Sequence, residues 1–291
     1  HGWNFLMEMR ARGEKSAPAA IVLGSDPIVF ALSSSKVSAM GEDELEIVGG
    51  FLGKPLEVVQ CETNDILVPA HVEMVIEGVI PLNSMEPEGP FGEMYGYMGA
   101  RKSKNFFMDV TAITHRENPL FVNQFSGITR GFLTSPIETA ANLRFKQKFE
   151  NFIGLHYPLE TPGFCFVNIN KNKTGEAIEI GNAISKSLKI AKITVVFDAD
   201  VDIHNTKEVL HALGSRWQPH DATQILEKAP GMGGDPSAIE HGFGSRIVID
   251  ATRQTAAEGG PKEYAKMNRQ CLEEGVPRIF ERIDKKYGHL L

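Results

Sequence analysis

The sequence has no long hydrophobic run and no obvious export signal. A membrane-spanning helix needs roughly 20 consecutive apolar residues, and every apolar stretch of this chain is much shorter. The first residues, HGWNFLMEMRARGEK, lack the order of basic, apolar and small residues that marks a secretory signal. We therefore expect a cytoplasmic protein that has no membrane partner.

Cysteine is scarce. Cys61, Cys165 and Cys271 are far apart, and no pair has the CxxC spacing. Disulfide frameworks and cysteine metal sites need more cysteines, arranged in pairs or clusters. The count fits a reducing compartment, and we expect each thiol to be a small, partly or fully buried hydrophobic group.

Clusters of positive charge are also missing. The chain has 30 Lys and Arg against 37 Asp and Glu, which gives a formal net charge of −7, and its basic residues are scattered. Binding to a nucleic-acid backbone depends on clustered cations that displace counterions. We therefore expect no nucleic-acid partner.

The first half of the chain is predicted to be mostly strands. Helices are expected after Asp26 and over residues 43–53, where a glycine ends the pattern. Residues rich in β-branched and aromatic side chains are separated by turn formers and predict a mixed or antiparallel sheet. These strand segments are residues 19–24, 56–61, 72–80, 104–117 and 120–126.

The second half alternates between strand and helix patterns, which indicates an α/β layer domain. One long helix is expected at about 135–152, residues 218–243 are expected to be loops, and a terminal helix begins after Pro261. The alternating strands are expected at 164–170, 192–200 and 246–252, with helices at 174–188 and 205–213.

The most unusual segment is PEGPFGEMYGYMG, residues 87–99, which holds Glu88 and Glu93 among glycines, prolines and aromatics. So many turn formers predict a loop that folds back on itself. Two carboxylates held together under aromatic cover would have different pKa values, which suits one proton donor and one charged organiser. The residues alone also allow an ordinary turn with solvated acids.

Three other patterns imitate functional motifs. Ser33-x-x-Lys36 with the later Lys-Thr-Gly at 173–175 resembles a serine acyltransferase, but the Ser-Asp-Asn element is missing. Asp198, Asp200 and Asp202 resemble the start of a calcium loop that lacks its glycine and closing glutamate. Residues 230–236, PGMGGDP, match neither a dinucleotide fingerprint nor a P-loop.

Several segments together resemble the UbiD family of prenylated-FMN-dependent decarboxylases and carboxylases. They are PEGPFGE, ETNDILVPAHVEMVIEG, VTAITHRENP, DELEIVGGFLG, KITVVFDADVDI and GFGSRIVIDAT. The resemblance implies an α/β (α+β) chain with a mixed or antiparallel split-barrel-like flavin-binding domain, a long linker helix and a C-terminal α/β layer domain. The implied boundaries are 1–133 for the C-terminal part of the flavin-binding domain, 134–155 for the linker helix, 156–260 for the α/β oligomerisation domain and 261–291 for the C-terminal helix and tail.

The resemblance also implies roles for individual residues. Glu88 matches the glutamate that pairs with a catalytic arginine, and Glu93 matches the acid that delivers the proton after carbon dioxide leaves. Glu44 and His1 match the ligands of a divalent metal, Mn²⁺ or Mg²⁺, with K⁺ as a further candidate. The remaining matches are to residues that contact the prenylated FMN or line the substrate side, namely Lys186, Ser34 and Ile137.

The implied function is a reversible, non-oxidative decarboxylation of an aromatic or α,β-unsaturated acid by a homo-oligomer, a dimer or larger. The family's catalytic arginine and a metal-binding asparagine lie before the matched region, so we expect that the chain is part of a longer protein. A non-catalytic assembly subunit, or a truncated relic of the same family, is the alternative.

Overall fold

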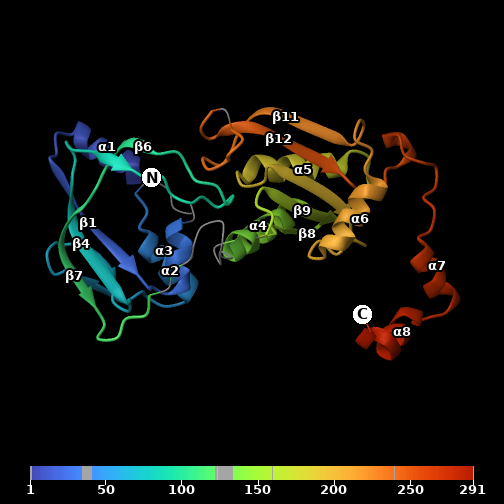
Figure 1. Ribbon diagram of the computed structural model, residues 1–291, viewed down its shortest axis with the longest axis horizontal. Helices are drawn as coiled ribbons and strands as arrows, with labels where there is room; N and C mark the ends of the chain where they lie inside the picture. Colours follow the sequence, from blue (N-terminus) through green and yellow to red (C-terminus); the bar gives the residue numbers. More distant parts are fainter. Residues whose placement is uncertain are drawn as a thin grey trace.

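The structure is a computed structural model that describes residues 2–34, 41–121, 123, 134–158, 160–238 and 240–290. Its helices and strands form two units followed by a C-terminal tail (Figure 1). The alternating strand and helix patterns of the second half of the sequence predicted an α/β organisation, and the described elements confirm it.

The N-terminal unit is built on a three-stranded antiparallel sheet in the order β1-β4-β7. Two short antiparallel ribbons, β2-β3 and β5-β6, are separate from it, so the described strands do not close into a barrel. The strands are β1 (Ser16–Leu23), β2 (Val58–Gln60), β3 (Leu67–Pro69), β4 (Met74–Pro81), β5 (Glu86–Glu88), β6 (Lys102–Asn105) and β7 (Asp109–His115).

Among its described residues this unit has the helices α1 (Gly2–Ala11), α2 (Pro27–Ser34) and α3 (Glu44–Leu52). The predicted starts of α2 and α3 are confirmed, because Asp26 accepts a hydrogen bond from the backbone N–H of Ile28 and Asp43 accepts one from Leu45, both at 2.8 Å. Gly53 ends α3 in the left-handed conformation with φ 67°.

The C-terminal unit contains a five-stranded mixed sheet in the order β11-β12-β10-β9-β8. Its three central strands are parallel, and the two edge strands are antiparallel to their neighbours. The strands are β8 (Phe152–His156), β9 (Phe164–Ile169), β10 (Ile193–Asp198), β11 (Thr223–Pro230) and β12 (Phe243–Asp250).

Helices cover both faces of this sheet. Side chains of α4 (Thr134–Lys148) and α5 (Glu176–Ser187) share one hydrophobic cluster with β8, β9 and β10. The opposite cluster joins α6 (Thr206–Arg216) to β9, β10 and β12. Buried parallel strands covered on both faces explain the near-continuous apolar runs in this half of the sequence.

Two boundaries in the second half were predicted wrongly. The linker helix ends at Lys148, and Phe152–His156 forms β8 instead of extending the helix to residue 152 or 155. Phe145 of the helix and Phe152 of the strand pack in the same cluster, so the apolar spacing continues across the boundary. Residues 218–243 also contain a full strand, β11, whose partly exposed edge position permits its charged residues.

The segment 104–117 was predicted as one strand, but residues 106–108 separate β6 from β7. At 120–126, Leu120 and Phe121 are not in a strand, and most of the rest lies outside the described residues.

The terminal helix begins later than expected. Residues 261–267 are not helical, and the Tyr264 hydroxyl accepts a hydrogen bond from the backbone N–H of Gln254 at 3.0 Å. Helices α7 (Asn268–Gly275) and α8 (Ile279–Tyr287) follow, and short 3₁₀ turns lie at Ala256–Glu258 and Gly288–Leu290. Cys271 on α7 is exposed, which corrects its expected burial, whereas Cys61 and Cys165 are buried as predicted.

None of the helices within the described ranges combines the length and apolar character that crossing a membrane requires.

Candidate functional site

The segment between β5 and β6 folds back on itself, as its turn-forming residues predicted. We call residues 89–99 the glutamate turn. The backbone N–H of Glu93 donates to Tyr97 O at 2.8 Å, and the N–H of Gly96 donates to Glu93 O at 2.9 Å. Gly89 and Gly96 have φ values of 74° and 78°, a conformation that glycine adopts without strain. This geometry fixes where Glu93 leaves the backbone.

Glu88 lies at the end of β5 and is held by two residues of the neighbouring strand. Its Oε2 accepts hydrogen bonds from Lys102 Nζ at 3.0 Å and from Asn105 Nδ2 at 2.5 Å. The bond from Lys102, supported by the one from Asn105, lowers the pKa of Glu88 below its usual range. Glu88 is therefore ionised at neutral pH, and the cation beside it in the described structure is a lysine.

The carboxylate of Glu93 lies in a tight space between two glycines. A Cβ at Gly99 would lie 2.9 Å from Glu93 Oε1, and a Cβ at Gly234 would lie 3.0 Å from Glu93 Oε2. Gly99 belongs to the glutamate turn, whereas Gly234 follows β11 in the C-terminal unit. The partly buried Glu93 therefore lies where the glutamate turn meets the C-terminal unit.

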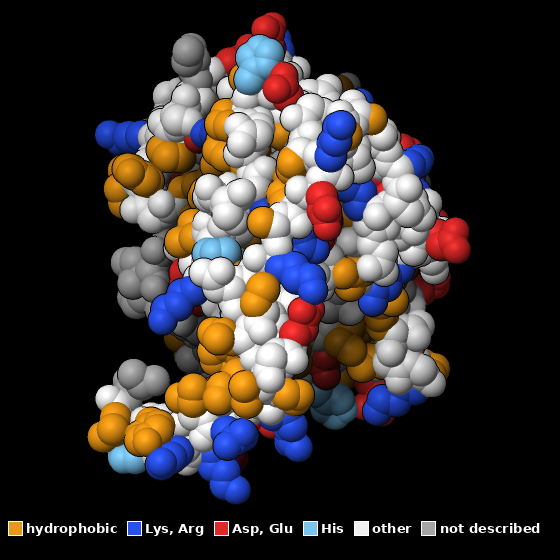
Figure 2. All heavy atoms as spheres, turned by 90° about the vertical axis from the view of Figure 1, so that its right-hand side faces the viewer, with side chains coloured by type: hydrophobic (Ala, Val, Ile, Leu, Met, Phe, Trp, Pro, Cys, Tyr) orange, Lys and Arg blue, Asp and Glu red, His pale blue; other side chains and the backbone are white. Residues whose placement is uncertain are grey.

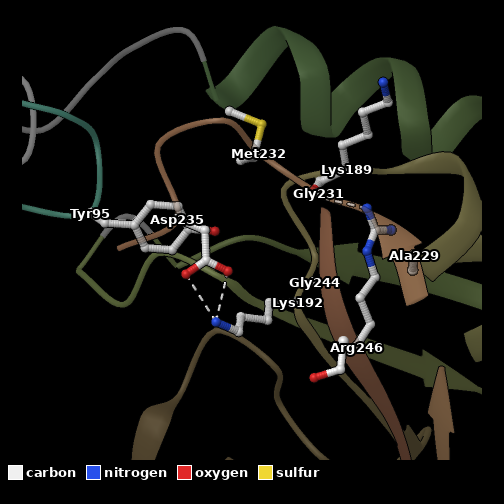
Figure 3. Close-up of a pocket in the computed structure, with 10 residues that line it drawn as sticks. Tyr95, Lys189, Lys192, Ala229, Gly231, Met232, Asp235, Gly244 and Arg246 are labelled. Carbon is white, nitrogen blue, oxygen red and sulfur yellow. Dashed lines mark hydrogen bonds and ion pairs between the residues drawn. The ribbon is translucent and has the colours of Figure 1, made fainter. Parts of the chain in front are cut away.

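Tyr95 extends this junction into a small pocket of the C-terminal unit (Figure 3). The pocket is lined by Lys189, Lys192, Asp235 and Arg246. Burial raises the pKa of Tyr95, and the charge of Asp235 raises it further, so the phenol stays protonated at neutral pH.

Arg246 is 5% exposed and has backbone partners at the end of α5. Its guanidinium donates to Ser185 O, to Leu188 O at 3.4 Å and to Lys189 O at 3.4 Å. Carbonyls at a helix C-terminus carry partial negative charge. Arg246 therefore closes α5 and fixes the wall of the pocket opposite Tyr95.

The other predicted site residues are more dispersed. Glu44 lies exposed in the first turn of α3, and Lys186 lies exposed in the last turn of α5. Ser34 ends α2 and Ile137 lies in α4, but their side chains, like all of His1, lie outside the described residues. Within the described ranges, no group of three His, Cys, Asp or Glu side chains is arranged to hold a metal ion.

Several residues at this site were missed by sequence reasoning. Lys102 and Asn105 become partners of Glu88 only through the pairing of β5 with β6. Gly234 and Asp235 lie in the PGMGGDP segment, which was set aside because it matched no phosphate-binding motif. Its density of glycine was the available signal, since glycine permits close approach to another segment.

The acidic turn after β10 has a structural explanation. Asp200 accepts hydrogen bonds from Arg216 and Arg253, and Asp202 accepts one from the backbone N–H of His204. These contacts give both aspartates a structural role, in agreement with the incomplete calcium-loop pattern of the sequence.

Two family models together match the chain up to residue 251. The model of the 3-octaprenyl-4-hydroxybenzoate carboxy-lyase Rift-related domain, UbiD, matches residues 1–129, and the model of the C-terminal domain of the same enzyme matches residues 132–251. Both match in the order that the two structural units follow.

Curated relatives and solved structures point to the same family. A phenolic acid decarboxylase of Sedimentibacter hydroxybenzoicus is 32% identical over 88% of this chain and 55% of its own length. The structure of the UbiD-class enzyme HmfF from Pelotomaculum thermopropionicum, in complex with FMN, is 30% identical with a TM-score of 0.80, over 97% of this chain and 61% of that one. An evolved dimeric form of HmfF, in complex with prFMN, is 28% identical with a TM-score of 0.76, over 97% and 59%.

The chain thus spans about half the length of the curated relatives that it matches. Both family models, the order of their domains and the shared structure lead to one conclusion. The chain belongs to the UbiD family.

Proposed function

We propose that the natural protein is a carboxy-lyase that reversibly removes carbon dioxide from an aromatic or α,β-unsaturated carboxylic acid with prenylated FMN. The observation that carries the proposal is the contrast between two acids five residues apart, Glu88 at the end of β5 and Glu93 in the glutamate turn. Lys102 and Asn105 keep Glu88 ionised, whereas Glu93 is confined between two glycines at the junction of the units. Paired acids in different surroundings suit different catalytic roles.

In the proposed reaction the bond between the substrate carbon and its carboxylate breaks, and carbon dioxide leaves. Prenylated FMN, when bound, supplies the electron sink for this cleavage. Glu93 donates one proton to the carbon that lost the carboxylate, and it regains that proton from solvent. Carboxylation follows the reverse course, in which Glu93 accepts the proton. Glu88 remains charged and orients the loop through Lys102.

The residues available near the end of α5 suit an anionic cofactor. Lys186 and Lys189 are both exposed cations in this region, and ammonium groups are common phosphate partners. Glu44 offers an exposed carboxylate on α3, a ligand type that Mn²⁺ and Mg²⁺ accept. We propose that Lys186 contacts the flavin phosphate and that Glu44 contributes to the metal beside it.

Replacing Glu44 by alanine is expected to lower the retention of flavin and divalent metal together. A divalent metal held partly by Glu44 would offset the negative charge of the flavin phosphate, so losing the ligand should weaken the retention of both. The measurement is flavin absorbance and metal content of the purified natural protein. Glu46→Ala, which removes an exposed acid from the same helical turn, serves as the matched control and should retain both. Normal flavin without metal in Glu44→Ala would contradict the shared dependence of flavin and metal on Glu44.

The exposed C-terminal tail supports a homo-oligomer of at least two subunits. In the described structure, Val276 is 45%, Ile283 41% and Tyr287 45% exposed. Figure 2 shows hydrophobic side chains gathered at the lower end of this face, beside Lys and Arg. Fully burying an exposed aliphatic side chain contributes about 1.5–3 kcal/mol, and covering the exposed part of each of these residues contributes a fraction of that. We propose that a second copy of the chain covers this surface.

Deletion of residues 261–291 is expected to reduce the oligomeric state seen by light scattering. A milder variant, Ile283→Asp, should weaken association because it places a charge in the apolar surface of α8. Lys285→Asp changes the charge of the same helix at an exposed position and should leave association intact. Unchanged mass for both the deletion and Ile283→Asp would indicate that the tail packs only within its own chain.

The alternative from another class is a non-catalytic assembly subunit or relic of the family. The absorbance spectrum of the purified natural protein separates the two, since the enzyme requires bound flavin and a relic does not. Turnover of a panel of aromatic and cinnamic-type acids, followed by carbon dioxide release, then tests activity itself. A serine acyltransferase would instead be labelled at Ser33 by an acylating inhibitor, although the Ser33 hydroxyl donates to Phe30 O at 2.8 Å.

A further inference from the structure

A loop of the C-terminal unit lies against the glutamate turn. We call residues 231–238 the glycine loop. Its Gly234 approaches Glu93 so closely that an added Cβ would lie within 3.3 Å of the side-chain atoms Oε2, Cδ and Cβ. Gly234 does not have a positive φ, so the close approach to Glu93, and not the backbone conformation, is the reason for glycine there.

The glycine loop is fixed by one ion pair (Figure 3). Lys192 Nζ donates to Asp235 Oδ2 at 2.7 Å and to Oδ1 at 3.0 Å, and it also donates to the Ser237 hydroxyl. The Asp235 side chain is only 12% exposed. Asp235 also accepts a hydrogen bond from the backbone N–H of Ser237 at 3.0 Å, so the same carboxylate shapes the turn that follows it.

Lys192 itself is held rigidly at the start of β10. Its backbone N–H donates to Gly163 O at 2.9 Å, and its carbonyl accepts from the N–H of Ile247 at 3.0 Å. Gly163 also touches the glutamate turn, because a Cβ there would lie 3.3 Å from Tyr95 Cε1 and 3.7 Å from Lys192 Cβ. Lys192 therefore lies next to both loops.

We propose that the Lys192–Asp235 ion pair is a latch that holds the glycine loop against the glutamate turn and so positions the carboxylate of Glu93. Lys192 and Asp235 are then positioning residues, and Gly234 leaves the space that the carboxylate occupies. The inference rests on the proposed role of Glu93 as proton donor, but the latch itself is a statement about two loops. A misplacement of a reacting group by about 1 Å can cost on the order of 10²-fold in rate.

The latch is tested first without activity, by hydrogen exchange on the natural full chain in the presence of prenylated FMN. Lys192→Met keeps the length of the side chain and removes its charge. Exchange is expected to rise in the glycine loop and in the glutamate turn together. Lys192→Arg keeps the charge and should restore protection in both. The control is Lys228→Met, which breaks the exposed pair with Glu240 at 3.3 Å near the same loop and should leave the glutamate turn unchanged.

Steady-state kinetics then test the consequence for Glu93. Lys192→Met and Asp235→Asn are each expected to lower kcat roughly 10- to 100-fold with little change in KM or flavin content. Gly234→Ala should have the same effect, because its methyl group would displace the carboxylate. Gly231→Ala is the matched control, since an added Cβ there would have no neighbour closer than 4.0 Å. Its kcat should equal that of the parent.

The outcomes separate the latch from the proposed chemistry. If exchange rises in the glycine loop alone and the glutamate turn stays protected, the latch is wrong, whatever the activity. If both loops open but Glu93→Gln turns over like the parent, the latch stands and the role of Glu93 in the proposed function is wrong. Equal kcat for Gly234→Ala and Gly231→Ala would overturn the positioning of Glu93 by the glycine loop. Should Lys192→Met not fold, Asp235→Asn tests the same ion pair from its other side.

Discussion

Glu93→Gln is expected to lower kcat for decarboxylation by on the order of 10²–10⁴-fold while flavin binding stays nearly intact. The amide has almost the same shape as the carboxyl group, so the contacts with Gly99 and Gly234 remain possible. It cannot release and regain a proton, which is the role proposed for Glu93. The measurement is initial rate and flavin absorbance on the same preparation.

Glu86→Gln provides the control for this change. Glu86 lies on β5 in the same segment, is exposed, and has no proposed catalytic role. Its turnover and flavin content should match the parent. Turnover of Glu93→Gln within a factor of a few of the parent would remove Glu93 from the role of proton donor, because general acid catalysis contributes more than that.

Lys171→Met is expected to destabilise the folded protein by about 3–5 kcal/mol. Lys171 Nζ donates to Glu258 Oε2 at 2.6 Å and to Thr252 Oγ1 at 2.9 Å, and it lies 3.5 Å from Asp250 Oδ2. The side chains of Lys171, Asp250 and Glu258 are 5%, 3% and 8% exposed. Loss of the Lys171 ammonium group leaves two buried carboxylates without their cation. Urea unfolding measures the resulting decrease in the free energy of unfolding.

Lys173→Met is the control, two residues further along the chain. Its ion pair with Glu179 is exposed, with both side chains more than half accessible. Exposed pairs contribute little, about 0–1 kcal/mol. The free energy of unfolding should therefore hardly change. Equal effects of the two substitutions would contradict the structural role assigned to Lys171.

The same network has a defined pH dependence. Burial acts to raise the pKa of Glu258, but hydrogen bonds from Lys171, Gly175 and Thr255 outweigh it and lower the pKa to about 2. The unfolded value is about 4.3. The stabilisation from Glu258 is therefore fully present above pH 4.3 and is lost as the pH falls toward 2. In Lys171→Met the pKa of Glu258 in the folded protein should move up toward about 4.3. The stability that the protein loses between about pH 4.3 and pH 2 should therefore be smaller than in the parent.

Local patterns predicted most of the fold because local interactions determine it. Asp26, Asp43 and Gly53 start or end helices through hydrogen bonds to nearby backbone groups. The strand runs of the second half are buried on both faces, which leaves a continuous apolar record in the sequence. The predictions of secondary structure were wrong where pairing with a distant segment determines whether a strand forms. β11 is a strand because it pairs with β12, although its composition is typical of a loop.

The candidate site divides in the same way. The glutamate turn could be identified from its own residues and from the family resemblance. Glu93 lies on it, and Glu88 directly precedes it at the end of β5. The partners of those acids could not be identified in this way, because Lys102 reaches Glu88 only through strand pairing and Gly234 reaches Glu93 only through contact between the two units. Contacts between segments that are far apart in the sequence leave no regular spacing of residues that a single sequence would show. The high glycine content of PGMGGDP indicated that another segment could approach it closely, but it did not indicate which segment.

The most direct measurement of the central claim is decarboxylation in D₂O by the natural protein with prenylated FMN. An accepted aromatic or α,β-unsaturated acid should release one carbon dioxide per product molecule, and mass spectrometry should find one deuterium at the carbon that carried the carboxylate. Glu93→Gln on the same substrate should yield almost no deuterated product while retaining its flavin. Release of carbon dioxide without deuterium at that carbon, or no release from a flavin-loaded protein across the acid panel, would contradict the account.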